Sequence, residues 1–434
     1  MGNHEFDEGA AELLRIQDGG CHPTDGCGDG TPYDGADFRY LSANAFVTET
    51  GEPLLAPYAI EKVDGVRIGF IGMTLEGTKA IVSQQGVAGL EFADEVETAN
   101  RYARELHEKG VKSIVVLLHE GGVQTGPDAW DVNGCSALTG PIVDIANGLD
   151  EKIDVVVSGH THQAYNCELS GKLVTSASSN GRLITDIDLR INSRSGEVVS
   201  AAANNVLVDR TVAMDPAQTA LISRYRTALG PIANENVGTT SAAITRTPAA
   251  SGESPLGNLI ADAQLAATDD EEGAVAAFMN PGGVRADLPA GPVTYEQAFT
   301  VQPFSNNLVT LDLTGAQLQC LLEEQYVGPA VRVLQPSATV RYTVTASGTP
   351  TTTGNCAAGR VLNETLTIGG VAVVDRQTYR VTVNNFLFGG GDGFTVLPGG
   401  QNPVTGPIDL DAFTAYLTAN QPVSAPATDR ITVQ

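Results

Sequence analysis

Short apolar runs alternate with polar and amphipathic stretches along the first half of the chain. The runs at 113–118 and 155–157 are rich in β-branched residues and predict buried strands, and 58–63 with 66–73 predicts a hairpin. Further strands are predicted at 38–44, 173–176 and 183–191, and helices at 8–15, 94–109 and 141–147. This alternation of strand and helix predicts an α/β fold.

A second set of elements starts near residue 237. It comprises predicted helices at 256–267, 294–299 and 315–325 and predicted strands at 274–279, 308–313 and 379–384. Residues 216–229 predict a helix between the two sets, which Gly230-Pro231 ends. We therefore expect a first domain over 1–212, a linker helix over 213–236 and a second domain over 237–434.

Histidines follow two of the predicted buried strands. His119 follows the strand at 113–118, and Gly159-His160-Thr161-His162 follows the strand at 155–157. Because the carboxyl ends of neighbouring parallel strands meet at one edge of a sheet, these histidines are expected to lie close together. Neutral imidazole is the commonest metal ligand, so we predict a metal site there. For the His-x-His pair alone, two solvated side chains at a strand end are the alternative.

The chain opens with a stretch rich in side chains suited to acid–base and metal chemistry. Asn3 offers a neutral carbonyl oxygen to a divalent metal. His4 can give a proton to a leaving oxygen, and Asp7, three residues further on, can hold its imidazolium. The alternative for these residues is a polar, frayed terminus.

The charge balance limits the partners of the protein. Asp plus Glu number 51 against 25 Lys plus Arg, a net charge of −26. Such a field repels nucleic-acid polymers and anionic membranes, and a phosphate substrate needs a local metal or arginine to overcome it. We see no apolar run long enough to form a transmembrane segment.

Six cysteines without a Cys-x-x-Cys pair favour disulfides over a zinc knuckle. Proximity in sequence favours Cys21–Cys27, Cys135–Cys167 and Cys320–Cys356, although other connectivities stay open. Disulfides indicate an oxidising location, so we expect a secreted, cell-surface or periplasmic protein. We find no signal peptide in the sequence, and expect that it belongs to a missing amino terminus.

Taken in order, the motifs resemble those of the 5′-nucleotidase family over nearly the whole chain. They are Gly2-Asn3-His4-Glu5, the strand-end His119, Gly159-His160-Thr161-His162, Asn280-Pro281-Gly282-Gly283-Val284-Arg285 and Gly390-Gly391-Asp392-Gly393-Phe394. The resemblance implies a calcineurin-like metallophosphatase domain joined to a carboxyl-terminal substrate-binding domain. The implied fold is α/β, a four-layer metallophosphatase β-sandwich flanked by helices, followed by a second α/β domain.

The resemblance also implies roles for the motif residues in hydrolysis of a 5′-nucleotide to a nucleoside and phosphate. Members of the family hold two divalent metal ions, often zinc or manganese. By resemblance, Asn3, His119 and His160 bind one ion and His162 the other, while His4 and Asp7 assist the leaving group.

In the second domain the resemblance implies a nucleotide-binding site. Asn280, Gly283 and Arg285 belong to the turn that contacts the nucleotide. Phe304 and Phe386 sandwich the base, and Asp392 accepts a hydrogen bond from the ribose. Ordinary core packing is the alternative for the two phenylalanines.

The sequence departs from the family at its start. The family has an Asp-x-His motif and a Gly-Asp motif with the bridging carboxylate before Asn-His-Glu, and here the sequence begins at Asn-His-Glu. We therefore expect a truncated chain that lacks the first βα units, with an incomplete second metal site, impaired activity and an unpaired sheet edge. Two other functions stay open: a cyclic-nucleotide phosphodiesterase or nucleotide-sugar hydrolase, and a non-catalytic nucleotide-binding protein.

Overall fold

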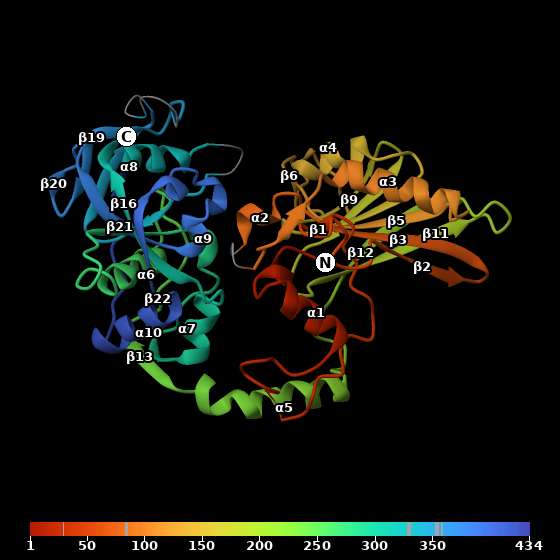
Figure 1. Ribbon diagram of the computed structural model, residues 1–434, viewed down its shortest axis with the longest axis horizontal. Coiled ribbons are helices and arrows are strands. Elements are labelled where there is room, and N and C mark those ends of the chain that lie inside the picture. The colour runs from red at the N-terminus through yellow and green to blue at the C-terminus, as the bar shows by residue number, and fades with distance from the viewer. Residues whose placement is uncertain (29, 83–85, 328–330, 352–355, 357–358) are drawn as a thin grey trace. The chain divides into compact units, whose positions relative to one another are not determined.

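The computed structural model describes residues 1–28, 30–82, 86–327, 331–351, 356 and 359–434. The chain divides into two compact units, Met1–Tyr225 and Arg226–Gln434 (Figure 1). The boundary falls within helix α5 (Pro216–Ala233), which includes the helix predicted at 216–229. Each unit has its own sheets and hydrophobic core, and each is described by itself.

Unit 1 is built on a six-stranded sheet in the order β2-β3-β5-β8-β10-β9. Its strands are β2 (Tyr58–Val63), β3 (Val66–Thr74), β5 (Ser113–His119), β8 (Val155–Ser158), β9 (Ala164–Leu169) and β10 (Lys172–Ala177). The pairs β3–β5, β5–β8 and β8–β10 are parallel. The register that places Leu118 opposite Ser158 brings the ends of β5 and β8 to the same sheet edge.

Helices α3 and α4 cover one face of this sheet (Figure 1). Asp94 caps α3 by accepting a hydrogen bond from the Glu97 N–H, and buried residues at helical spacing face the sheet. The helices of unit 1 are η1 (His4–Phe6), α1 (Ala10–Asp18), α2 (Thr78–Ile81), α3 (Glu95–Glu108) and α4 (Pro141–Gly148). Two small sheets add β1 (Ala45–Val47) with β4 (Leu90–Phe92), and β6 (Val123–Gln124) with β7 (Leu138–Thr139).

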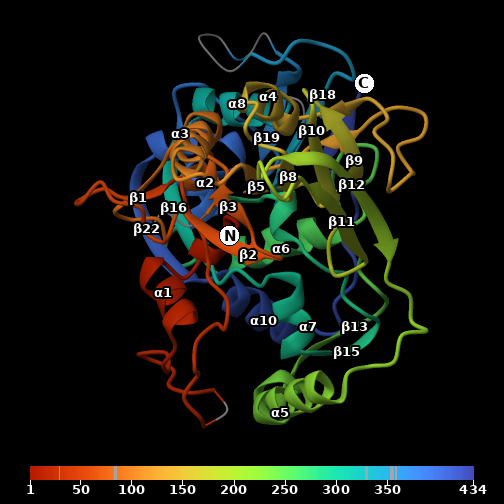
Figure 2. The ribbon, with the colours of Figure 1, turned by 90° about the vertical axis from the view of Figure 1, so that its right-hand side faces the viewer.

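A long antiparallel pair, β11 (Leu183–Ile191) and β12 (Val198–Leu207), lies on the opposite face of the sheet. Figure 2 shows it running beside β9 and β10. Alternate residues such as Ile187, Leu189 and Ala201 pack on Val115 and Val155, as expected for strands with one buried face. Within the described residues β11 pairs only with β12, so this second sheet contains two strands.

The strand predicted at 38–44 is wrong. The backbone here is irregular and the strand begins at Ala45. Leu41 and Ala43 are buried, which accounts for the apolar pattern. The N–H of Ser42 bonds the Ala56 carbonyl and that of Ala43 bonds the Gly72 carbonyl, so scattered partners replace a ladder.

Unit 2 contains a five-stranded sheet, a four-stranded sheet and a two-stranded sheet. The five-stranded order is β17 (Gln335–Pro336), β14 (Ala276–Met279), β21 (Thr378–Asn384), β16 (Asn307–Thr314) and β22 (Gln401–Ile408). The four-stranded order is β20 (Val371–Ala372), β19 (Val361–Ile368), β18 (Val340–Val344) and β23 (Ile431–Val433), and β13 (Asn236–Thr240) pairs with β15 (Gly291–Thr294).

Two hydrophobic cores fill unit 2. One joins α8 to β18, β19 and the larger sheet, and the other joins α6, α7 and α10. The helices are α6 (Pro255–Ala266), α7 (Tyr295–Val301), α8 (Gly315–Glu324), α9 (Asn385–Phe388) and α10 (Asp409–Ala419), with the short turns η2 (Pro281–Gly283), η4 (Gly391–Gly393) and η5 (Leu397–Gly399). Thr294 and Thr314 each form a capping box, which sets where α7 and α8 begin.

Three disulfides join Cys21 to Cys27, Cys135 to Cys167 and Cys320 to Cys356, which confirms the pairing favoured by proximity. The predicted α/β class with a second α/β unit is confirmed as well. Among the described helices, none is long and apolar enough to cross a membrane.

Candidate functional site

In unit 1 the predicted metal ligands His119 and His160 lie side by side. His119 is the last residue of β5, and His160 follows β8 by two residues. Their rings meet edge to face, with centroids 5.3 Å apart. His160 and His162 both have left-handed backbone conformations, with φ of 65° and 57°. Such strain in non-glycine residues is typical of functional turns.

Glycines bring the chain close to the ring of His119. A Cβ on Gly2 would lie 2.8 Å from three atoms of that ring, and one on Gly159 would lie 3.3 Å from its Nδ1. The two turns also interlock, because the Thr161 hydroxyl donates to the Gly122 carbonyl at 2.8 Å. The amino-terminal segment and both strand ends are therefore packed around one imidazole.

Asn3 and His119 have the electronic properties that metal ligands need. Within the described part of the chain, the buried side-chain oxygen of Asn3 has no hydrogen-bond partner. Burial, with a smaller contribution from the nearby His160, lowers the pKa of His119 to about 4. His119 is therefore neutral at physiological pH, and its nitrogen lone pair can bind a cation. An amide oxygen and two imidazoles suit zinc or manganese.

His4 and Asp7 also come together. The Nδ1 of His4 lies 2.8 Å from the Oδ2 of Asp7, in the turn formed by η1. The His4 side chain is half exposed, so it can reach a solvent-borne substrate. His162 is exposed and lies two residues beyond His160 on the same turn.

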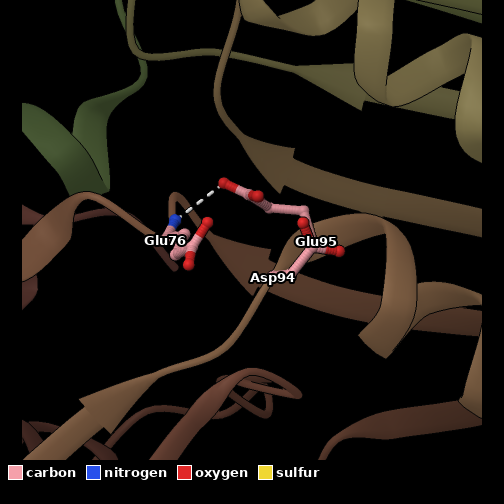
Figure 3. A group of neighbouring side chains, drawn as sticks. All are labelled: Glu76, Asp94 and Glu95. Atoms are coloured by element: carbon pink, nitrogen blue, oxygen red, sulfur yellow. Dashed lines mark hydrogen bonds between the residues drawn. The ribbon is translucent and has the colours of Figure 1, made fainter.

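A second group of possible metal ligands consists of Glu76, Asp94 and Glu95, whose carboxylate oxygens lie within 4.8 Å of one another (Figure 3). Asp94 accepts from the Glu97 N–H and Glu95 accepts from the Glu76 N–H, each at 2.7 Å. Burial raises the pKa of Glu95. Helix capping accounts for Asp94 and a backbone hydrogen bond for Glu95, and we assign no ion to this group. The sequence reasoning did not single it out.

In unit 2 the structure joins the two predicted glycine-rich turns. The Nδ2 of Asn280 donates to the Oδ2 of Asp392 at 3.2 Å. Asp392 has a left-handed conformation with φ of 58°, and the glycines at 390 and 393 also have positive φ. Burial raises the pKa of Asp392, while Arg332 and the Asn280 hydrogen bond lower it.

Arg285 and Phe304 are in contact. The guanidinium carbon of Arg285 lies 5.7 Å from the centroid of the Phe304 ring, within the range of a cation–π interaction. The Arg285 N–H bonds the Val301 carbonyl, which ties the turn after β14 to the end of α7. Gly283 lies close to the Met279 side chain, since a Cβ there would lie 2.3 Å from its terminal methyl carbon and would require that side chain to move.

Phe386 lies in α9, close to the turn that contains Asp392. A Cβ on Gly391 would lie 2.6 Å from the Phe386 ring, so ring and turn are packed together. Asn384 caps α9 by accepting from the Leu387 N–H, and its Nδ2 donates to the Asn280 Oδ1 at 3.0 Å. Phe386 is only partly buried, and partly packs on the core of unit 2.

The sequence reasoning missed two residues of this group. Asn384 ends β21 beside Asn280, and its position at a strand end next to Phe386 is a signal that could have found it. Arg332 lies in a loop, and its Nε is 3.5 Å from the Oδ1 of Asp392. No sequence pattern marks Arg332.

Comparisons with known proteins show which proteins this chain resembles. Residues 236–399 match the 5′-nucleotidase, C-terminal domain. The chain is 35% identical to "Endonuclease YhcR" of Bacillus subtilis over 99% of its length, and 30% identical to "Cell wall protein Lmo0130" of Listeria monocytogenes over 96%. It spans 33% and 55%, respectively, of those two proteins.

The crystal structure of a 5′-nucleotidase precursor from Thermus thermophilus is similar over the whole chain. The TM-score is 0.75 at 29% identity, and the match covers 100% of this chain and 82% of the other. Fold and residue clusters thus define a two-unit α/β protein that is similar throughout its length to a 5′-nucleotidase. Residues 236–399 belong to the 5′-nucleotidase C-terminal domain family, as the motifs of the second half predicted.

Proposed function

We propose that this protein hydrolyses the phosphate ester of 5′-nucleotides to a nucleoside and phosphate, in a metal-dependent reaction. The observation that carries the proposal is in unit 1. The buried oxygen of Asn3, which has no hydrogen-bond partner among the described residues, belongs to the segment that packs against His119, and His160 lies beside that ring. An unpaired buried amide oxygen is costly, and a bound cation would satisfy it.

Asn3, His119 and His160 would hold one divalent ion, zinc or manganese, and His162 a second. When bound, such ions act as Lewis acids toward a phosphoryl oxygen and lower the pKa of water. His4, held by Asp7, would donate the proton that the leaving ribose oxygen requires. Because only His162 is assigned to the second ion, we expect turnover to be slow.

Unit 2 would bind the nucleoside part of the substrate. Phe304 and Phe386 would stack on the base, and Asp392 would accept from the ribose. The turn with Asn280, Gly283 and Arg285 would contact the nucleotide. The contacts between Arg285 and Phe304 and between Asn280 and Asp392 support this assignment. The division into domains over 1–212 and 237–434, with a linker at 213–236, is part of the proposal.

Phosphate release from AMP by the purified chain tests the reaction. We expect release that requires added manganese or zinc, stops with a chelator, and is lost in His119→Gln and His160→Gln. His107→Gln is the matched control, because His107 is exposed on α3. Bound metal without any phosphate release from AMP would contradict the proposal. Release from cyclic AMP or a nucleotide sugar instead of AMP would favour the diesterase alternative.

A second candidate function is nucleotide binding without catalysis. The network of Asn280, Asn384 and Asp392 lies wholly within unit 2, so binding there does not depend on the histidines. Adenosine binding that survives a chelator, with no phosphate release, would support this candidate. Metal-dependent phosphate release would exclude it.

The location that we propose is outside the cytoplasm: secreted, at the cell surface or periplasmic. Three disulfides join all six cysteines, which requires an oxidising environment. The relative from Listeria monocytogenes is named as a cell wall protein, which supports the same location. Detection of the intact disulfides in protein recovered from the culture medium or cell envelope would test this.

A further inference from the structure

Among the described residues, Arg332 is the basic residue paired with Asp392. Its Nε lies 3.5 Å from the Oδ1 of Asp392, while Asn280 donates to the other carboxylate oxygen, Oδ2, at 3.2 Å. The two oxygens are thus held from two sides, by a cation and by a neutral donor. Asn384 fixes Asn280 in turn, through a hydrogen bond of 3.0 Å to the Asn280 Oδ1.

The backbone around Arg332 is anchored to α8. The Arg332 N–H bonds the Gln325 carbonyl at 3.0 Å, and the Leu334 N–H bonds the Gln325 Oε1 at 2.7 Å. Gln325 is itself buried and donates to the Leu322 carbonyl. Arg332 therefore extends from a fixed support, and its side chain, 47% exposed, remains accessible to solvent.

The burial of Asp392 explains why a neighbouring cation is needed to keep its carboxyl group ionised. The carboxyl group is largely withdrawn from solvent, and burial raises its pKa. Arg332 and the Asn280 hydrogen bond lower that pKa again, which favours the carboxylate. An ionised carboxylate has two oxygens that only accept, so it can accept from two neighbouring hydroxyls at once. A protonated carboxyl group loses part of that capacity.

We propose that Arg332 is a positioning residue that holds the Asp392 carboxylate for the two vicinal hydroxyls of a ribose, so that unit 2 prefers ribonucleosides to 2′-deoxyribonucleosides. This inference rests on the proposed nucleoside site. What it adds is the role of Arg332, a residue that no motif contains. A 2′-deoxyribose lacks one hydroxyl, so one carboxylate oxygen of Asp392 receives no hydrogen bond from the sugar. This lost hydrogen bond is the basis of the preference for ribonucleosides.

Calorimetric titration of the full chain with adenosine and with 2′-deoxyadenosine tests the proposal. We expect the wild-type protein to bind adenosine about tenfold more tightly, the difference that one hydrogen bond to a charged group makes. Arg332→Gln should weaken adenosine binding about tenfold and 2′-deoxyadenosine binding much less, so the preference shrinks. Arg332→Lys should restore part of it, because it restores the charge.

The control is Arg341→Gln. Arg341 is 45% exposed and pairs with Asp429 at 3.7 Å in the same unit, so it matches Arg332 in exposure and pairing. The Arg341→Gln variant should bind adenosine and 2′-deoxyadenosine with the same affinities as the wild type. In a protein that already carries Asp392→Asn, Arg332→Gln should not weaken adenosine binding further, because the two residues act through one contact.

The pH dependence of adenosine binding distinguishes an electrostatic role of Arg332 from a role in packing alone. Arg332 and Asn280 are the groups that lower the pKa of Asp392, so Arg332→Gln should raise it. The adenosine affinity of the variant should then fall at a higher pH than that of the wild type as the solution is acidified. An unchanged preference and pH profile in a folded Arg332→Gln protein would overturn the inference while leaving nucleoside binding intact. Failure of the wild type to bind adenosine would overturn both.

Discussion

The rings of His119 and His160 meet edge to face, with centroids 5.3 Å apart, at the ends of two paired parallel strands. The backbone brings the two rings together, because β5 and β8 are paired in parallel and end at the same edge of the sheet. Two imidazoles at this spacing can approach one cation from two sides.

Removal of either imidazole should weaken metal binding. We expect the wild-type chain to retain one tightly bound zinc or manganese ion, and His119→Gln or His160→Gln to lower the affinity by more than about tenfold. Elemental analysis after dialysis measures the bound ion. His107→Gln, on the exposed side of α3, should match the wild type. Equal metal content in all four proteins would rule out these ligands.

The close approach of Gly2 to His119 predicts a specific effect of one methyl group. A Cβ on Gly2 would lie 2.8 Å from three ring atoms of His119, so Gly2→Ala must displace the ring. We expect about a tenfold loss of metal affinity with little change in thermal stability, because the ring can rotate within a partly open site. Gly28→Ala is the control, since its Cβ would have no neighbour within 4 Å. Wild-type metal affinity in Gly2→Ala would show that His119 does not bind the ion.

Phe304 should contribute base stacking to nucleoside binding. Phe304→Ala should weaken adenosine binding by roughly tenfold or more, since stacking of one base on an aromatic ring is worth about 1–3 kcal/mol. Phe299→Ala is the matched control, because Phe299 is a partly exposed phenylalanine on the neighbouring helix α7. Isothermal titration measures both. Similar losses in the two variants would point to disturbed packing of α7 and would contradict a stacking role.

Asp409 should make unit 2 less stable as the pH rises from about 4 to about 7. Burial raises its pKa to about 7, although Asn306 and the Leu410 N–H donate hydrogen bonds to it. Between these pH values the unfolded chain loses the proton while the folded chain keeps it, so the free energy of unfolding falls, by roughly 2–4 kcal/mol.

Asp409→Asn removes this titration. The variant should unfold at a higher temperature than the wild type at pH 7 and at a similar temperature at pH 4. Asp270→Asn, on the exposed turn after α6, is the control and should follow the wild type. Thermal unfolding monitored by circular dichroism from pH 4 to pH 8 checks the difference. If the unfolding temperatures of wild type and Asp409→Asn changed with pH in parallel, the Asp409 carboxyl group would titrate normally.

Much of the parallel sheet in unit 1 could be predicted from local sequence. The β-branched runs before His119 and His160 are short and apolar and have glycine within a few residues of their ends, a pattern typical of buried strands. The strand predicted at 38–44 is absent because Leu41 and Ala43 are buried without a strand ladder, and isolated hydrogen bonds, such as that from the Ala43 N–H to the Gly72 carbonyl, satisfy the backbone. Helix α10 and strand β22 were not predicted, because β22 is exposed along its length and α10 begins without a side-chain cap.

Local sequence was enough to predict the resemblance to 5′-nucleotidases and the residue types at the candidate sites, because the motifs lie where strands end and glycines allow tight turns. Which of these residues meet depends on the folded chain. The contact of Arg332 with Asp392, and that of Asn384 with Asn280, join segments that are far apart along the chain. That the buried Asn3 oxygen has no partner within the described part of the chain is likewise a property of the folded structure. Local patterns record periodicity and turn chemistry, whereas burial and long-range pairing depend on how the whole chain packs.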